Sequence, residues 1–461
     1  MLKKFVLMNL IFAQALCLKA ATSDSSISVD NLNTYLNTAS TSEINTSSLT
    51  GDFGFQSNSL IEDVGEVVGN EYFGEFNIKY QSVTSENTYK GFEIKTRINN
   101  EEILEYSIKE AVIDFRYSNS RLALGRTNLD WSYADSVWSL GKINNRINFD
   151  YFEPEEEGLI GVFYDKKYSS GIDVSLFTSF VYVPETNQGL VIDKENRAVE
   201  CKTAWCDAPV SNAELNGKDV PIYYDVNYPD ISDAIFRYSA GLKLGAQVGR
   251  FYANAFYLRK PENEVSVAAE ISLAVDGSEI NVEVTPQFYY HDVKGANIEY
   301  KLNEEAKLYV SSISIVPEKY PDGDEPYIQY TEIKIKKKKE DYISTGFIYN
   351  NGDLKSHLGY IARVSEFDTE NDVLVNYPRW NQALHLSGSK KLTRKVFVHL
   401  DYKYDMITED RLTMFKTSYS FGPSVVASLG VNIIGTNQSK ESYWTKFENN
   451  DSVYSSLIYS F

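Results

Sequence analysis

Four histidines are the first residues to test for catalysis or metal binding: His291, His357, His385 and His399. No two of them have the spacing of zinc ligands on one helix, and no cysteine pair lies near one. The sequence also lacks a Gly-x-Ser-x-Gly nucleophile elbow. It therefore predicts no enzyme, metal site or cofactor, and we expect His399, between Val398 and Leu400, to face a wet interior.

A cysteine pair could form a structural disulfide. Cys201 and Cys206 enclose four residues, and the third cysteine, Cys17, lies in a segment that we expect to be removed on export. An even pair in an exported chain predicts a disulfide, which would pin a small loop. Trp205 lies inside that loop, where a structural anchor is favoured over a contact with a ligand or partner.

Charged residues form a third set, because they occupy every second position of long segments. Glu93, Lys95 and Arg97 alternate with apolar residues between positions 92 and 98. Such alternation places one face of a strand in an apolar medium and the other in water. The candidates for a water-filled lumen are Glu93, Lys95, Arg97, Asp114, Arg116, Glu283, Glu299, Lys301, Asp401 and Lys403.

Period-two segments must position these residues. They cover 74–80, 92–98, 111–117, 280–290, 296–302 and 396–404. The longer ones exceed the ~5–6 residues of soluble strands and match the ~9–11 of a tilted membrane strand. Gly, Asn, Asp and Pro clusters between segments predict tight turns. The fold prediction is an all-β, antiparallel transmembrane meander barrel of about 18–22 strands with long extracellular loops.

The two ends of the chain set the domain prediction. Lys3 and Lys4, the apolar stretch 5–18 and the small residues Ala20 and Ala21 are typical of a secretory signal peptide. We therefore expect a signal peptide at 1–21, a periplasmic arm or linker at 22–50 and the barrel at 51–461. A short helix within the arm that plugs the barrel remains an alternative.

The charge balance limits the partners. The formal net charge is -19, with 64 acidic and 45 basic residues. Nucleic acid is excluded because phosphate binding needs a basic footprint. An acidic chain fits either a lumen that attracts cations or long solvated loops, and both interpretations stay open.

Three long connections, at 127–158, 184–232 and 366–380, are predicted to be extracellular loops. Counting strands backward from Phe461, with that end in the periplasm, puts the cysteine-bearing loop on the wrong side. One strand between Phe236 and Trp380 is therefore missed or invented in the expected count.

The last residues, 456–461, resemble the C-terminal signature of Gram-negative outer-membrane barrels of the porin type. Phe461 is aromatic, and the alternate positions Tyr459, Leu457 and Val453 are apolar, whereas Ser455 departs from the pattern. The segment 121–126 also resembles the strand with Gly-Arg that many porins place before a long loop. The resemblance implies an outer-membrane location in lipid, recognition of Leu457, Tyr459 and Phe461 by the barrel-assembly machinery, and a homotrimer.

The leading functional hypothesis is a channel for passive diffusion of ions and small hydrophilic solutes, with a preference for cations. A barrel this wide leaves an aqueous lumen, and an inward-folded loop would set its exclusion size. The alternative, from another class, is a surface or attachment barrel with a plugged lumen whose loops bind a partner.

Overall fold

The structure is a computed structural model of the 461-residue chain. It describes residues 46–61, 70–84, 87–101, 103–147, 151–185, 190–193, 195–206, 209–318, 328–329, 332–334, 338–365 and 377–461. The predicted signal peptide, most of the predicted N-terminal periplasmic segment (22–50) and residues 366–376 of the third long connection lie outside these ranges.

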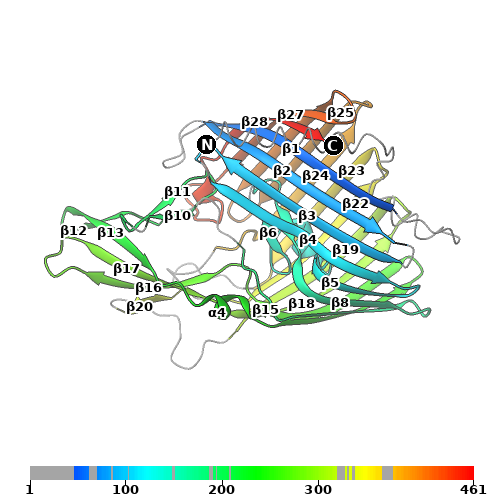
Figure 1. The fold of residues 1–461 in the computed structure, drawn as a ribbon, viewed down its shortest axis with the longest axis horizontal. Helices are drawn as coiled ribbons and strands as arrows, with labels where there is room; N and C mark the ends of the chain where they lie inside the picture. Colours follow the sequence, from blue (N-terminus) through cyan, green and yellow to red (C-terminus); the bar gives the residue numbers. More distant parts are fainter. Residues whose placement is uncertain are drawn as a thin grey trace.

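Eighteen antiparallel strands form one sheet in chain order (Figure 1), and the pairing of β1 with β28 closes it into a barrel. This confirms the predicted meander barrel, with a strand number at the lower end of the expected range. The barrel strands are β1 (Thr46–Leu60), β2 (Asn70–Val83), β3 (Thr88–Asn99), β4 (Leu104–Arg116), β5 (Ser120–Thr127), β8 (Leu159–Lys167), β9 (Ile172–Ser179), β14 (Ser239–Val248), β15 (Phe251–Pro261), β18 (Tyr290–Lys301), β19 (Ala306–Pro317), β22 (Glu340–Asn350), β23 (Leu354–Arg363), β24 (Gln382–Lys391), β25 (Val396–Asp405), β26 (Arg411–Ser420), β27 (Val425–Gly435) and β28 (Ser452–Ser460).

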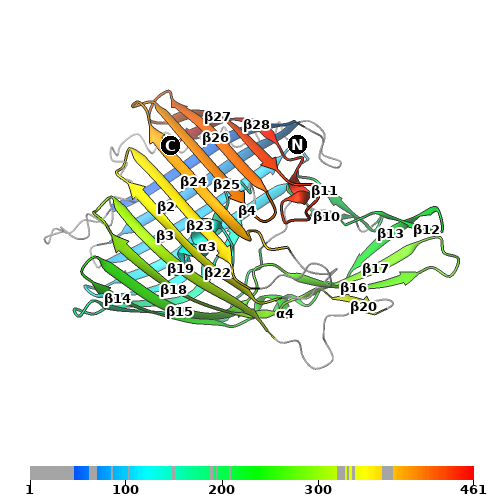
Figure 2. The ribbon, with the colours of Figure 1, turned by 180° about the vertical axis from the view of Figure 1, so that it is seen from behind.

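The two ends of the barrel differ in their connections (Figure 2). Tight turns such as 117–119 and 249–250 join strands at one end, where β1 also begins and β28 ends. The long connections gather at the other end. This distribution is typical of outer-membrane barrels, whose periplasmic turns are short.

The wall has an apolar outer face and a polar inner face. Val310 on β19 and Leu358 on β23 are 48% and 56% exposed on the outside, whereas Ser311 and His357, their neighbours in sequence, are buried inside. On β28, Leu457 and Tyr459 belong to the exposed outer row, and Ser455 interrupts that row. The alternation predicted from the sequence therefore describes the wall itself.

Three long connections jointly build a second sheet outside the barrel, which we call the arm (Figure 1). The β9–β14 connection supplies two strands, the β15–β18 connection two more and the β19–β22 connection the last two. In spatial order they are β12 (Asn212–Leu215), β13 (Lys218–Val226), β17 (Ile280–Gln287), β16 (Ser266–Leu273), β21 (Glu332–Lys334) and β20 (Ile328–Gln329).

The arm corrects one prediction. The segment 280–290 was expected as a membrane strand, but most of it is β17, and Glu283 is exposed on the arm rather than facing the lumen. Alternation marks any half-buried strand, so it cannot separate an arm strand from a wall strand. Six barrel strands lie between Phe236 and Trp380, and the cysteine-bearing connection then falls at the long-loop end, which resolves the miscount.

The remaining elements are short. They are α3 (Tyr133–Trp138), α4 (Ile231–Ile235), the 3-10 turn η1 (Thr445–Phe447), the hairpin of β6 (Asn145–Ile147) and β7 (Glu155–Glu157), and the hairpin of β10 (Leu190–Asp193) and β11 (Ala198–Cys201). Among the described residues, no helix combines the length and apolarity needed to cross a membrane.

Gly125 on β5 offers a test of the wall. Its φ is +124°, and a Cβ there would lie 2.0 Å from the carbonyl oxygen of Ala111. Gly125→Ala should cost about 3 kcal/mol in backbone strain alone and lower the fraction that shows heat-modifiable migration on a gel. Gly388→Ala is the matched control, because its Cβ would meet nothing within 4 Å. Equal folded fractions for the two variants would contradict the prediction.

Candidate channel constriction

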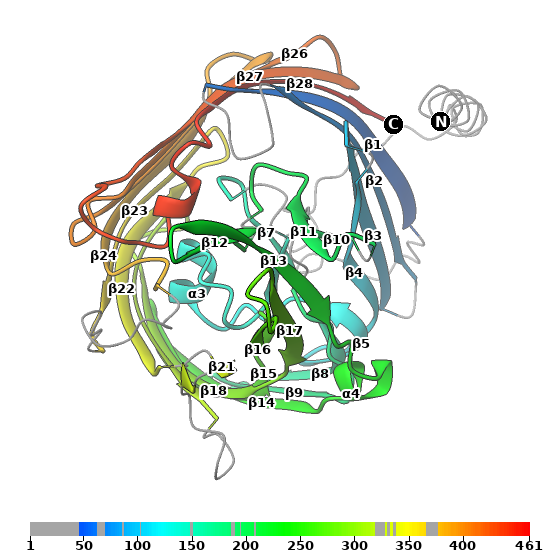
Figure 3. The same cartoon turned by 90° about the vertical axis from the view of Figure 1, so that its left-hand side faces the viewer.

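The connection between β5 and β8 folds into the barrel, where Figure 3 shows α3 inside the ring of strands. Ser132 caps α3 by accepting a hydrogen bond from the backbone N–H of Asp135. The buried carboxylate of Asp135 in turn accepts from the N–H groups of Lys142, at 2.8 Å, and Ile143, at 3.0 Å. Burial raises the pKa of Asp135. The carboxylate thus joins α3 to the residues that follow the helix.

Small polar residues on β18 and β19 receive this helix. The N–H of Ala134 donates to Ser311 Oγ at 3.0 Å, and the N–H of Tyr133 donates to Asn297 Oδ1 at 3.2 Å. Asn297 also donates from Nδ2 to the carbonyl of Trp131 at 2.6 Å. The wall therefore satisfies backbone groups at the start of α3 that have no partner within the helix.

An ionic contact extends this attachment toward the short-turn end. The hydroxyl of Tyr133 donates to Glu299, and Lys307 Nζ lies 3.1 Å from the same carboxylate and 2.7 Å from the Tyr133 oxygen. Glu299, predicted to face the lumen, does so and contacts the inward loop.

Histidines on β23 and β24 form the wall beside the end of α3. His357 and His385 approach through their Nδ1 atoms at 3.0 Å, and His385 Nε2 lies 2.7 Å from Asp401 Oδ2. The ring of Trp138 packs edge-on against His385 at 5.5 Å between centroids. Its Nε1–H donates to Ser344 Oγ at 2.9 Å. His385 thus contacts the helix directly, while His357 and Asp401 hold His385 in place.

Neutral imidazoles satisfy this chain of contacts in one consistent arrangement. The hydroxyl of Tyr309 donates to His357 Nε2 at 3.0 Å, His357 Nδ1–H donates to His385, and His385 Nε2–H donates to Asp401. Asp401 also pairs with Lys403 at 2.8 Å. The ring nitrogens of His357 and His385 thus all have hydrogen-bond partners within the protein, and the two histidines support the constriction.

On the opposite wall, β7 lies against β4. Glu155 Oε1 is 2.8 Å from Lys95 Nζ, and Glu155 Oε2 is 2.7 Å from Lys109 Nζ. Burial raises the pKa of Glu155, but the two ammonium groups outweigh burial and hold that pKa at about 2. The loop therefore carries a carboxylate that stays ionised at physiological pH.

Two further ion pairs anchor the loop. Arg126, at the end of β5, donates to Glu157 at 2.7 Å and to the carbonyl of Gly158 at 2.8 Å. Lys416 on β26 pairs with Glu153 at 2.9 Å. The loop is thus tied to three parts of the wall, around β3–β5, β18–β24 and β26, and spans the lumen.

The structure brings most of the predicted lumen residues together in ion pairs on the inner face. Glu93 pairs with Lys79 and Lys109, Arg97 with Glu75, and Asp114 with Arg116 and Arg121. Lys301 is exposed at the short-turn rim, and Glu283 lies on the arm. The residues placed on the inner face as predicted are Glu93, Lys95, Arg97, Asp114, Arg116, Glu299, Asp401 and Lys403.

Sequence reasoning missed two kinds of residue. Lys109 faces inward because the register of β3 and β4 shifts at Glu93, which inserts an extra residue in β4. A strict period of two cannot predict such a bulge. The contact between His357 and His385 joins residues 28 apart on neighbouring strands, so only the strand register, and no sequence spacing, could have revealed it.

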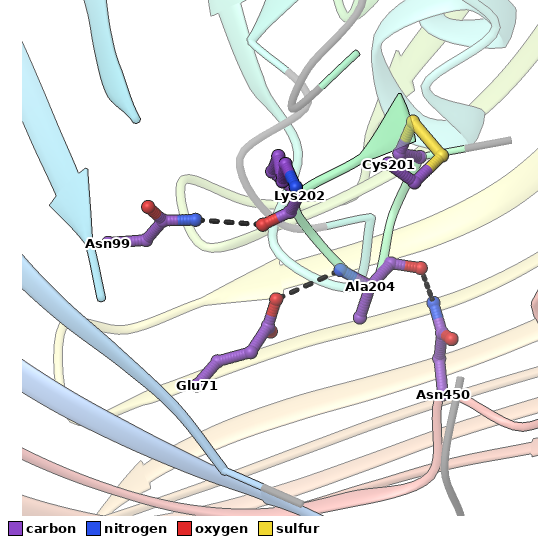
Figure 4. The surroundings of a disulfide bond; sticks show 7 residues. Glu71, Asn99, Cys201, Lys202, Ala204 and Asn450 are labelled. Atoms are coloured by element: carbon purple, nitrogen blue, oxygen red, sulfur yellow. Dashed lines mark hydrogen bonds between the residues drawn. A yellow bond between two sulfur atoms is a disulfide. The ribbon is translucent and has the colours of Figure 1, made fainter. Parts of the chain in front are cut away.

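The cysteine-bearing loop enters the mouth of the barrel, and its cysteines are joined by a disulfide (Figure 4). The N–H of Ala204 donates to Glu71 on β2 at 2.9 Å, and its carbonyl accepts from Asn450 at 2.7 Å. Asn99 on β3 donates to the carbonyl of Lys202 at 2.9 Å. Backbone groups of the pinned loop are therefore bound by side chains of the barrel rim.

An aromatic cluster joins this loop to the constriction. Trp205 is buried, and its ring lies 5.1 Å from Tyr151 of the inward loop and 5.6 Å from Phe447 of the β27–β28 connection. Trp444 packs on Trp380 at 5.4 Å, and Arg379 lies over both Tyr151 and Trp444. In the structure Trp205 is a packing anchor, and four connections meet around it.

The arrangement can narrow and polarise a pore, with charged groups on both the loop and the wall. Within the described ranges, no group of three or more His, Cys, Asp or Glu residues is placed to hold a metal ion. What the geometry offers is selection by width and by electric field.

No family model matches the chain, and no curated protein matches it. Among solved structures, it is similar to OccD3 of Pseudomonas aeruginosa, at 11% identity and a TM-score of 0.45, over 90% of each chain. It is also similar to OccK11 of the same organism, at 11% and 0.45, over 90% of this chain and 95% of that one. For OmpF of Salmonella typhi the values are 10% and 0.41, over 91% and 100%. Identities this low do not indicate which solute this chain binds.

Glu155→Gln tests the anchoring carboxylate. The change leaves Lys95 and Lys109 without their shared negative partner, so the field beside the loop becomes more positive. The cation-to-anion permeability ratio should fall by about twofold, as measured by the reversal potential in a KCl gradient. Glu409→Gln, which breaks an exposed pair with Lys440 in the β25–β26 connection, is the control and should leave the ratio unchanged.

Glu156 gives the constriction a pH dependence. Burial, then the neighbouring Asp135, raise the pKa of Glu156 from 4.5 to about 7, so ionisation is less favourable in the folded chain than in the unfolded one. Stability should therefore fall as pH rises from about 4.5 through 7. Glu156→Gln removes that loss: its Tm should match the wild type at pH 5 and exceed it at pH 8. A Tm difference that is constant with pH would refute this.

Proposed function

We propose that the chain forms a channel in the bacterial outer membrane through which ions and small hydrophilic solutes diffuse passively. The observation that carries this is the closed 18-stranded barrel with an apolar outside, a charged inside and one loop tied across its lumen. A barrel of this strand number is wide enough for an aqueous pore. Its mechanism is selection without a chemical step.

A preference for cations is the finer part of the proposal. The chain carries a net charge of -19, and the inward loop contributes Glu153, Glu155 and Glu157, together with Glu156, which its raised pKa leaves only partly ionised near neutral pH. Lysines and arginines of the wall pair with several of these acids. The electric field along the pore therefore comes from the acidic residues that outnumber the basic ones. Acidic focusing at the mouth and constriction favours entry of cations.

Insertion would proceed through the last strand. Leu457 and Tyr459 point outward on β28, which pairs with β1 at the closing seam, and Phe461 follows them. We propose that this exposed row is what the barrel-assembly machinery recognises.

A second function is favoured by the arm. Its six strands come from three connections and extend well beyond the barrel, as Figure 1 shows, while the disulfide-bonded loop occupies the mouth. An attachment barrel with a plugged lumen, whose arm binds a partner, would use these features. The two functions differ in whether the lumen conducts.

Single-channel recording in a planar bilayer tests the proposal. Stable open-channel steps are expected, with a reversal potential in a KCl gradient of the sign that cation selectivity requires. Silence at high protein load, from protein whose heat-modifiable migration shows a folded barrel, would favour the plugged attachment barrel. A reversal potential of anion-selective sign would overturn the cation preference alone.

A further inference from the structure

Large apolar side chains cluster on the surface where the arm leaves the barrel. Tyr228, Ile231 and Phe236, in and around α4, are 62%, 76% and 72% exposed. Phe180, just after β9, is 75% exposed, and Tyr238, just before β14, is 50% exposed. We call these five residues the lip. Isolated exposed apolar residues are common on proteins, whereas a group of this size marks an interaction surface.

The lip continues the outer face of the barrel. Phe180 extends the outward row of β9 that contains Leu176, and Tyr238 extends the outward row of β14 that contains Leu242. These two strands are paired with each other. On β14 the row reaches the lip through Ala240, and on β9 one polar residue, Thr178, lies between Leu176 and Phe180. The lip therefore lies next to the surface that faces lipid in the proposed channel.

The short helix α4 separates apolar from acidic side chains. Ile231 and Ile235 are one helical turn apart, and Asp233 lies between them on the opposite side. The carbonyl of Ile235 accepts from the N–H of Tyr182 at 2.8 Å, which fastens α4 to the chain that follows β9. Ile231 is exposed, Ile235 is partly buried, and Asp233 is exposed on the other side of the helix. The helix α4 thus has one apolar and one acidic side, as interfacial helices have.

Polar and aromatic groups of the neighbouring strands β15 and β18 lie beside the lip. Arg259 points outward from β15 and contacts Asp292 at 3.1 Å and the Tyr238 hydroxyl at 3.4 Å. The tilted rings of Tyr238 and Tyr290 pack with their centroids 5.0 Å apart, and the Tyr257 hydroxyl donates to Asp292 at 2.8 Å. Tyrosines and arginine at this level are typical of a membrane–water boundary.

We propose that the lip is embedded in the lipid of the outer leaflet and fixes the root of the arm to the membrane surface. The occupant is lipid because the apolar outward row of β14 runs through Ala240 into the lip and because aromatic and charged groups typical of a membrane–water boundary lie beside it. This inference rests on the proposed membrane location, and a second copy of the chain on the same surface is a competing outcome that the test separates.

The native tryptophans make the test clean. All five, at positions 131, 138, 205, 380 and 444, are buried in the inward loop or the mouth cluster. None lies on the outer wall, so a lipid-borne quencher should leave the native fluorescence nearly unchanged. A tryptophan added at the surface then reports its own surroundings.

Three single variants in vesicles of brominated phosphatidylcholine form the experiment, after heat-modifiable migration has shown that each folds. Leu242→Trp, on the outer face of β14, marks lipid, and Val275→Trp, at the exposed β16–β17 turn, marks water. Phe236→Trp tests the lip and should lose the same fraction of its added fluorescence as Leu242→Trp. Val275→Trp should be quenched only by aqueous acrylamide.

Each outcome decides one point. If Leu242→Trp is not quenched by brominated lipid, the membrane location fails. If Leu242→Trp is quenched but Phe236→Trp behaves like Val275→Trp, the location stands and the lip is overturned. If Phe236→Trp is shielded from both quenchers, protein rather than lipid covers the lip, which also overturns the proposal and points to a second copy.

Discussion

The constraint on which the structure depends is that a sheet surrounded by lipid must have no edge. The pairing of β1 with β28 meets it, because every barrel strand then has two neighbours. Closure separates an apolar outside from a polar inside. Because the strands alone complete the sheet, the barrel does not depend on the connections for its fold. The inward loop can therefore be shaped by its own contacts, such as those of Asp135, and need only attach to the wall.

The inward loop is attached to the wall through polar contacts, and its two sides differ. Around α3 the wall supplies neutral partners, Asn297 and Ser311, together with the linked histidines, whereas around β7 it supplies Lys95 and Lys109 to a loop carboxylate. Removing one member of a partly buried pair leaves an uncompensated charge. The position of the constriction therefore depends on complementary charge as much as on packing.

The fold could be predicted from the sequence because alternation and tight turns are local signals. They placed Glu93, Lys95 and Arg97 on the correct face of β3. The same signal misassigned Glu283, because a strand of the arm alternates as a wall strand does. The contacts of His357, Tyr309 and Trp138 join distant segments through strand register and loop path, and no sequence spacing encodes those.

The arm has a consequence for the order of assembly. β13 pairs in parallel with β17, and between them in the chain run the wall strands β14 and β15. β21 reaches β16 only across β18 and β19. The paired strands are distant in sequence, so their pairing stabilises the chain little until the wall strands have brought the ends of the three connections together. The arm therefore forms only after the barrel wall has folded. A binder specific for the arm would distinguish assembled barrels from chains that are still being exported.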